Sequence, residues 1–597
     1  MATIQGVYVA LFGRPADPTG LAYFNSVTSN GANLNGIGDL AGTQEFKDRF
    51  KDFSNTQIVN SIYNSLFGRD AEAAGLNFFV DALNKGTLNV KNIAIAILDG
   101  AQGTDKTIVT NKVAAADLYT KALDTPVEIA SYVGNNAAAA GRTFISGVTT
   151  TVPTAGAVDT AVATMVTNSG VPGNTLSLVT GTDAIVVGTA ATNSTDKNDT
   201  FNAKDGAGLA NFWAPASDTI NGGFGTDTLN ATMYVTTAAA TSGKVATDGL
   251  KSVEVVNVTS TGVATNLDLT AAKELTQIWN VGSTGNFSAI GLSAAQTTAG
   301  LSGALGTNTS TFGFTGVGTS DTAKLAFNAA TGTGAVSIAS AGTIAITNSG
   351  TSSQTNLTFD AAKTVTVAGS GDLTIGFATT TVTEAVNSSS FSGNLNANVG
   401  GLGNLKTVTT GGGNDTVTID VTHANDVTIN TGAGNDTINV VSDAGATKAI
   451  ALTGGAGADA FVFGATGTLL ANVNLAGGAT AAEIVKTLVT VSDFDKAADA
   501  IKVVAGTPAT ARATLTGTDL GTISGQSDLY LAASKAAELA NFNSGASKVA
   551  VFAYGTDSYI YQDVDGSGAL STGDMLVKVA GVSDVTSFTA TNFVLAA

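Results

Sequence analysis

Apolar residues in the first part of the chain recur with the period of an α-helix. The stripe from Ile58 to Phe67 places them at i, i+1, i+4, i+5, i+8 and i+9, and a similar stripe runs from Ile4 to Phe12. Both stripes run into the same pair of segments, L-F-G-R and G-L-x-x-F, at an offset of 55 residues. The pattern predicts a helical domain over residues 1–170 with an internal duplication of a helix-turn-helix unit. We expect the glycine that closes each stripe to be a left-handed C-cap.

Beyond residues 171–174 the period changes to two, which is typical of half-buried strands. Short alternating runs, among them Val336–Ile338 and Leu357–Phe359, recur every 8 to 13 residues with Gly, Ser and Asn between them. This spacing predicts an all-β region, built either as a β-solenoid (β-roll) or as sandwich-like segments. We divide it into a strand-rich region over 176–400, a β-roll with repeated Gly-Asp motifs over 401–510, and a C-terminal β region over 511–597.

Composition narrows the chemistry available to this chain. Of 597 residues only 12% are charged, and 27 Lys plus Arg against 46 Asp plus Glu give a net charge of −19. Such a chain repels phosphate backbones, so we expect no nucleic-acid partner, whereas clustered carboxylates favour multivalent cations. Cys is absent and His423 is the one histidine, which excludes disulfides, thiolate metal sites and two-histidine zinc sites. No apolar run is long enough for a transmembrane segment.

The most specific motif in the sequence is a nonapeptide calcium repeat, G-G-x-G-x-D-x-U-x, in which U is an apolar residue. Residues 222–229 and 454–461 match it fully, and residues 410–417 and 431–438 lack only its first Gly. Glycines permit the tight turn that directs backbone carbonyls inward, Asp adds a hard carboxylate oxygen, and the apolar residue begins a strand. Plain Gly-Asn-Asp turns without calcium are the alternative. The predicted calcium-binding residues are Gly223, Gly225, Asp227, Gly411, Gly413, Asp415, Gly432, Gly434, Asp436, Gly455, Gly457 and Asp459.

A second acidic motif spans residues 563–574 and is similar to an EF-hand calcium loop. Its predicted ligands at positions 1, 3, 5, 7 and 12 include a backbone carbonyl at position 7, and Asp replaces the usual Glu at position 12. The flanking segments alternate like strands, so we predict a strand-loop-strand site, and a β-hairpin with a solvated acidic turn is the alternative. The residues that would hold the ion are Asp563, Asp565, Ser567, Ala569 and Asp574.

Three further aspartates, Asp493, Asp495 and Asp499, lie around Phe494. They would cap the solenoid and hold another cation. A solvated loop explains them equally well.

These motifs resemble two known families. The repeats, the S-D-F-x-x-x-x-D-x-I segment from Ser492 to Ile501 and the apolar, hydroxylated end from Thr586 to Leu595 look like repeats-in-toxin (RTX) proteins, which leave the cell by type I secretion through an uncleaved C-terminal signal. The duplicated L-F-G-R-x-A-x-x-x-G-L sequence resembles the helical domain of RTX-containing surface-layer (S-layer) proteins of Gram-negative bacteria. The resemblance implies an extracellular surface protein, anchored to lipopolysaccharide or another glycan by its N-terminal domain, whose calcium-loaded β part self-assembles into a lattice.

An enzymatic role is not expected. A zinc protease of the H-E-x-x-H class needs more than one histidine, and neither a G-x-S-x-G elbow nor a phosphate-binding loop is present. We expect His423 to be a solvent-facing strand residue and not a base. The alternative to a lattice protein is a secreted RTX-type adhesin that binds glycan without forming a lattice.

Overall fold

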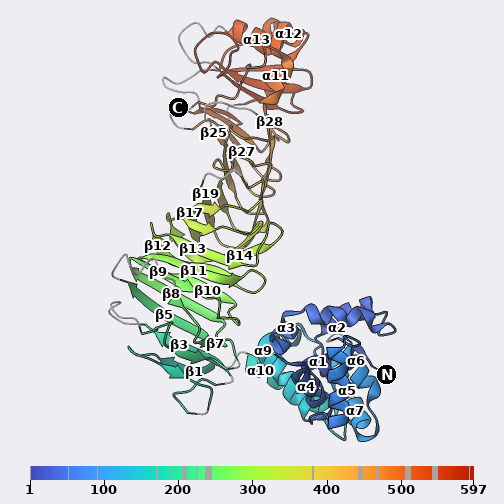
Figure 1. Cartoon of the computed structure of the whole chain (residues 1–597). Coiled ribbons are helices and arrows are strands. Elements are labelled where there is room, and N and C mark those ends of the chain that lie inside the picture. Colours follow the sequence, from blue (N-terminus) through green and yellow to red (C-terminus); the bar gives the residue numbers. More distant parts are fainter. Residues whose placement is uncertain are drawn as a thin grey trace. The chain divides into compact units, whose positions relative to one another are not determined.

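A computed structural model describes residues 2–596 except 52, 90–91, 170–171, 189, 196, 205–211, 224, 236–244, 379–381, 442–447, 466–468, 505–511, 541–548 and 590–591. It shows a small helical N-terminal region followed by a long all-β region that forms a β-solenoid of about 12 turns (Figure 1). The expected fold class is confirmed, and the choice between solenoid and sandwiches is settled in favour of the solenoid. The described part of the chain contains no helix with the length and apolar character needed to cross a membrane.

The duplication of the helical region is visible in its contacts. Helices α1 and α4 both end at a left-handed glycine, Gly13 with φ 70° and Gly68 with φ 72°. The arginine that follows each cap lies over two aromatic rings of its own helix and pairs with a carboxylate, Arg14 with Glu45 at 2.6 Å and Arg69 with Asp105 at 2.6 Å. The N-terminal helices are α1 (Ile4–Phe12), α2 (Pro18–Val27), the 3₁₀ helix η1 (Leu34–Gly42), α3 (Gln44–Phe50), α4 (Asn55–Phe67), α5 (Ala73–Asn84), α6 (Ile93–Gly100), α7 (Gly103–Ala122), α8 (Pro126–Ser131), α9 (Gly134–Ser146) and α10 (Ala155–Ser169).

The solenoid strands pair in parallel with the strand two positions further along the chain. Val336–Ile338 pairs with Leu357–Phe359, and Ile344 to Ile346 pairs with Val365 to Val367, so the alternating runs found in the sequence are successive coils. The strands up to this point are β1 (Pro172–Ser177), β2 (Ala184–Ile185), β3 (Asn198–Ala203), β4 (Thr219–Asn221), β5 (Thr228–Val235), β6 (Val245–Ala246), β7 (Leu250–Lys251), β8 (Val255–Gly262), β9 (Ala264–Asp268), β10 (Gln277–Val281), β11 (Asn286–Ser293), β12 (Thr298–Gly306), β13 (Ser310–Thr315), β14 (Thr322–Gly332), β15 (Val336–Ile338), β16 (Thr343–Ser349), β17 (Ser352–Phe359) and β18 (Thr364–Gly369).

The solenoid core contains a stack of aliphatic side chains from successive coils, together with buried phenylalanines. Each side chain in this stack is almost completely buried, and burial of one such group stabilises the fold by about 1.5–3 kcal/mol. Alternation places the intervening Thr, Ser and Asn on the outer surface. One continuous row, read from the strand register, is Ile344, Val365, Val386, Val408, Ile429, Leu452, Val491 and Val579.

The C-terminal part departs from pure β structure. The strands β30 (Val549–Tyr554), β31 (Asp557–Gln562) and β32 (Met575–Val579) form an antiparallel meander, and β32 also pairs in parallel with β28 (Val489–Val491). Residues 511–597, predicted as a β region, also contain helices α12 (Gly517–Ser524) and α13 (Leu529–Ala540). The alternation rule missed α13 because five of its six buried residues are alanines at helical spacing, Ala532 to Ala540, which carry a weak apolar signal.

The remaining elements are β19 (Leu373–Phe377), β20 (Ala385–Phe391), β21 (Leu395–Asn398), β22 (Thr407–Thr409), β23 (Thr416–Asp420), β24 (Val427–Asn430), β25 (Thr437–Val441), β26 (Ile450–Thr453), β27 (Ala460–Phe463), α11 (Ala481–Lys486), β28 (Val489–Val491), β29 (Ala500–Val504), α12 (Gly517–Ser524), α13 (Leu529–Ala540), β30 (Val549–Tyr554), β31 (Asp557–Gln562), β32 (Met575–Val579), the 3₁₀ helix η4 (Val585–Ser587) and β33 (Phe593–Ala596).

Candidate metal sites

The three Gly-Asp motifs of the β-roll stack on one another, one per coil. Gly432, Gly434, Gly455 and Gly457 have φ between 91° and 145°, a conformation that L side chains rarely adopt. A Cβ on Gly434 would also collide with the carbonyl oxygen of Gly413 in the coil before it. The glycines are therefore required both by backbone conformation and by the close approach of successive turns.

Two of the predicted glycine carbonyls accept hydrogen bonds from the next coil. The carbonyl oxygen of Gly411 accepts the N–H of Ala433 at 3.0 Å, and that of Gly432 accepts the N–H of Ala456 at 2.9 Å. These carbonyls join one turn to the next, so the glycines act first as spacers of the stack.

The aspartates of the stacked turns form a ladder of buried carboxylates, which we call the aspartate ladder: Asp415, Asp436, Asp459 and Asp499. Each accepts a backbone N–H from the coil before it through Oδ1. The N–H of Asp415 donates to Asp436 at 2.8 Å, that of Asp436 to Asp459 at 2.9 Å, and that of Asp459 to Asp499 at 2.9 Å. Residues 20 to 40 positions apart are thereby brought into direct contact.

A ladder of asparagines, which sequence reasoning missed, runs beside the aspartates in the opposite direction. The N–H of Asn414 donates to Asn394 Oδ1 at 2.8 Å, that of Asn435 to Asn414 Oδ1 at 2.8 Å, and that of Ala458 to Asn435 Oδ1 at 2.9 Å. The signal was present as the repeated dipeptide Asn-Asp before Thr and an apolar residue. Asn and Asp together tie each turn to the coils on both sides.

The second carboxylate oxygen, Oδ2, is the atom of the ladder residues that remains available to a proton or a cation. Oδ2 of Asp415, Asp436 and Asp459 is buried and has no hydrogen-bond donor among the described residues. A threonine hydroxyl lies near each of the first two, but Thr410 Oγ1 donates to the carbonyl of Thr431 at 2.6 Å and Thr431 Oγ1 donates to that of Gly454 at 2.9 Å. These oxygens are left to be neutralised by a proton or by a cation.

Burial raises the pKa of the ladder carboxyls. The pKa of Asp436 rises to about 6, and the charges of neighbouring Asp415 and Asp459 add to the shift. Burial is also the main cause that raises the pKa of Asp415, Asp459 and Asp499. Ionised carboxylates in this position are costly unless paired. Calcium prefers oxygen ligands of this kind, so the residues present fit the predicted ion.

The separate copy at Gly223, Gly225 and Asp227 has the same geometry. Gly223 and Gly225 have φ of 90° and 136°, and buried Asp227 Oδ1 accepts the N–H of Asp199 at 2.7 Å. The N–H of Thr226 donates to the side chain of Asn198 at 2.9 Å, as in the asparagine ladder. Asp199 was not predicted, although it follows Asn and precedes Thr as Asp415 and Asp436 do.

Asp493, Asp495 and Asp499 lie at the last of these turns. Asp493 accepts the N–H groups of Gly454 and Gly455 at 3.0 and 2.8 Å, and Asp499 Oδ2 accepts the N–H of Asp495 at 2.8 Å. Phe494 packs against Phe461 and Phe588. This arrangement is the cap of the final glycine turn, and its carboxylates are largely used by backbone donors.

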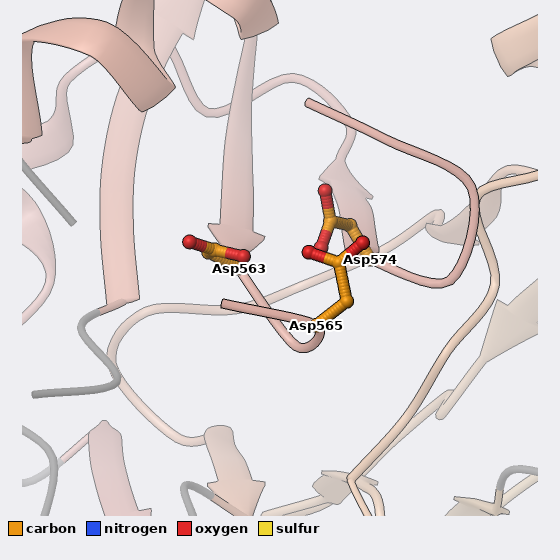
Figure 2. Close-up of side chains that lie close together, drawn as sticks. All are labelled: Asp563, Asp565 and Asp574. Carbon is orange, nitrogen blue, oxygen red and sulfur yellow. The ribbon is translucent and has the colours of Figure 1, made fainter. Parts of the chain in front are cut away.

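The C-terminal acidic loop brings three carboxylates together, as Figure 2 shows. One oxygen from each of Asp563, Asp565 and Asp574 lies within 4.8 Å of the others. Strands β31 and β32 flank the loop, which confirms the predicted strand-loop-strand arrangement. Asp563 and Asp574 are buried, whereas Asp565 is exposed.

Hydrogen bonds within this loop hold the carboxylates in place. Asp563 Oδ2 accepts the N–H of Gly568, the glycine at position 6, at 2.8 Å. Asp565 accepts from Ser571 Oγ at 2.7 Å, and Asp574 Oδ2 accepts the N–H of Ser571 at 2.7 Å. Ser571, at position 9, is a candidate site residue that the sequence analysis did not name.

Two predicted ligands of the loop contact each other, since Ser567 Oγ donates to the carbonyl of Ala569 at 2.9 Å. Burial raises the pKa of Asp574 to about 6 and raises that of Asp563, whereas the hydroxyl of Ser571 lowers that of Asp565. A group of three carboxylates with such different environments suits a divalent cation, which would favour the ionised form of all three.

His423 is buried and does not face solvent, contrary to the sequence expectation. Its two ring nitrogens lie 3.3 Å from the carbonyl oxygen of Leu402 and 2.8 Å from that of Asp420. Contacts of this kind fix the ring inside the solenoid wall.

Comparison with known proteins adds one finding for the helical region. A family model described as a domain of unknown function (DUF4214) matches residues 38–103, which include helices α3 to α6. No curated protein matches the chain. The match covers neither the solenoid nor the acidic loop.

Proposed function

We propose that this chain is a secreted structural protein of the bacterial cell surface, an S-layer protein that folds when it binds calcium outside the cell. The observation that carries the proposal is the aspartate ladder, in which Asp415, Asp436 and Asp459 each keep a buried carboxylate oxygen without a donor among the described residues. The acidic loop at residues 563–574 supplies a second, differently built cation site.

Calcium linkage is large enough to control folding. A site that binds calcium only in the folded state adds about 2.7 kcal/mol when the free ion is a hundredfold above its dissociation constant. Four such sites would add about 11 kcal/mol, which is comparable with the stability of a whole domain, about 5–15 kcal/mol. In a calcium-poor cytosol the ladder carboxylates would repel one another and keep the chain loosely folded for export by a type I secretion machinery.

The remaining parts of the proposal follow the family resemblance. The duplicated helical region would anchor the protein to lipopolysaccharide or another surface glycan, and copies of the β part would contact one another in a two-dimensional lattice. The absence of a recognised catalytic motif from the sequence fits a structural role.

The test uses the full chain refolded with calcium, with magnesium or with chelator. Calcium should produce the β circular-dichroism signal at micromolar to millimolar concentration, and electron microscopy should then show ordered sheets. Magnesium is the matched control because it demands tighter octahedral geometry. Equal folding in chelator would refute calcium-dependent folding, and calcium-dependent folding without ordered sheets would favour the secreted adhesin.

A further inference from the structure

A row of outward-facing residues crosses the early coils of the solenoid, with one residue from each coil. Its first members are three asparagines whose side-chain amides are joined in series. Asn257 Nδ2 donates to Asn230 Oδ1 at 2.9 Å, and Asn230 Nδ2 donates to Asn202 Oδ1 at 3.1 Å. The amide series ends at Asn257, whose own side-chain carbonyl accepts no hydrogen bond within the described part of the chain.

The next residue in this row is Trp279, which pairs with Asn257 on one side and with Gly300 on the other. The ring lies directly over Gly300, since a Cβ at that position would collide with Cδ2 and Cε3 of the indole. Trp279 Nε1 donates to Gln277 Oε1 at 2.8 Å, which fixes the ring about its side-chain torsions. The indole therefore lies against the sheet and is partly exposed.

A second row, two residues further along the strands, completes a groove. Thr259, Val281, Ser302 and Asn328 form this row, and the groove has a volume of about 270 Å³. The side chains of Thr259, Ser302 and Asn328 make no hydrogen bond with another described residue, so their polar groups are available to a ligand. Lys204 adds a cation at one end of the groove.

We propose that this groove binds a saccharide. A pyranose ring has an apolar C–H face that packs on an indole, and hydroxyls at its rim that pair with amides and hydroxyls, which donate and accept in the same group. The groove is slightly smaller than the usual range for ligand pockets, about 300–1,000 Å³, so it fits one or two sugar rings.

Other ligand classes fit less well. A peptide strand would need a free sheet edge, but β10 is already paired on both sides, with β8 and β12. A nucleic acid would be repelled by the net charge of −19, and the groove offers a single lysine to its phosphates. The site is separate from the metal sites and does not depend on lattice formation.

Tryptophan fluorescence gives a direct test in the full chain. The sequence has two tryptophans, and Trp213 is 1% exposed, so a saccharide in the groove should change the emission of Trp279 alone. Maltotriose, cellotriose and chitotriose are the probes, titrated to millimolar concentration. We expect a saturable change with at least one of them. No change with any probe, or a change that persists in W279F, would overturn the proposal.

Two further variants keep Trp279 as the fluorescent probe and change the residues on either side of it. Gly300→Val should tilt the indole and weaken saccharide binding at least tenfold, and Asn257→Ala should weaken it by removing the amide beside the ring. Thr347→Val is the matched control, since Thr347 is exposed on the same outer face, paired with Ala326. Circular dichroism checks the fold of each variant, and equal binding by all three would contradict the site.

Discussion

The aspartate ladder and the acidic loop both gather buried carboxylates, but they satisfy them in different ways. In the loop, both oxygens of Asp563, Asp565 and Asp574 accept hydrogen bonds from the loop itself or from Tyr561. In the ladder, Oδ1 accepts from the neighbouring coil and Oδ2 of Asp415, Asp436 and Asp459 has no donor among the described residues. The loop is locally preorganised, whereas the ladder holds charge that a proton or a cation must neutralise.

The largest expected effect concerns the turns that carry the ladder. Gly434→Ala should destabilise the protein by about 4 kcal/mol, because the new Cβ meets the carbonyl of Gly413 and the backbone has φ 133°. The measurement is urea unfolding in calcium. Gly412→Ala is the control, since nothing lies within 4 Å of its Cβ and its effect should stay below about 0.5 kcal/mol. Equal effects of the two substitutions would contradict the stacked-turn geometry.

Two substitutions of Asp436, the central ladder residue, distinguish the roles of its two carboxylate oxygens. Asp436→Ala removes the acceptor of the Asp415 N–H and should cost about 3 kcal/mol in chelator, and more in calcium because Oδ2 is lost as well. Asp436→Asn keeps that acceptor and removes the buried charge, so its stability in chelator should equal or exceed that of the unsubstituted protein while stabilisation by calcium falls. Thermal unfolding in calcium and in chelator measures both effects. If the Asn variant keeps its full response to calcium, Oδ2 is not a ligand.

The ladder should also respond to pH when calcium is absent. Burial raises the pKa of Asp436 to about 6 in the folded state, against about 3.9 when unfolded, so the folded state binds more protons between these values. The free energy of unfolding should therefore fall by about 2 kcal/mol as the pH rises from about 4 to about 6. Urea unfolding in chelator over this range measures the slope, which Asp436→Asn should reduce. An unchanged slope in that variant would show that Asp436 does not cause it.

The smallest effect is expected at the exposed member of the loop. Asp565→Ala should change stability in chelator by less than about 1 kcal/mol, because Asp565 is exposed and its hydrogen bonds, from Ser571 Oγ and the Ser567 N–H, lie at the surface. It should still weaken calcium binding to the loop, which isothermal titration calorimetry can measure. Asp574→Ala should destabilise the protein even without calcium, since it leaves the backbone N–H groups of Val564 and Ser571 without their acceptor. If Asp565→Ala and Asp574→Ala lowered the stability in chelator equally, the expected difference between the exposed and the buried aspartate would be contradicted.

The sequence predicted the elements that depend on periodicity. The helical duplication, the strand runs and the strand-loop-strand site appear where hydrophobic spacing placed them, because each is set by residues close together in the chain. The role of Asn414 and Asn435, the partnership of Asp199 with Asp227 and the burial of His423 depend on which coil lies above which. Coil length varies along the chain, so that register could not be read from the spacing of the motifs.

The C-terminal meander decides how the solenoid ends. Above β28 the next strand in the sheet is β32, which is held on its other side by the antiparallel strand β31. Another chain therefore cannot add a parallel coil at that position and extend the stack as a fibre. Growth by backbone pairing is blocked at this strand, so copies that meet there must recognise one another through their side chains.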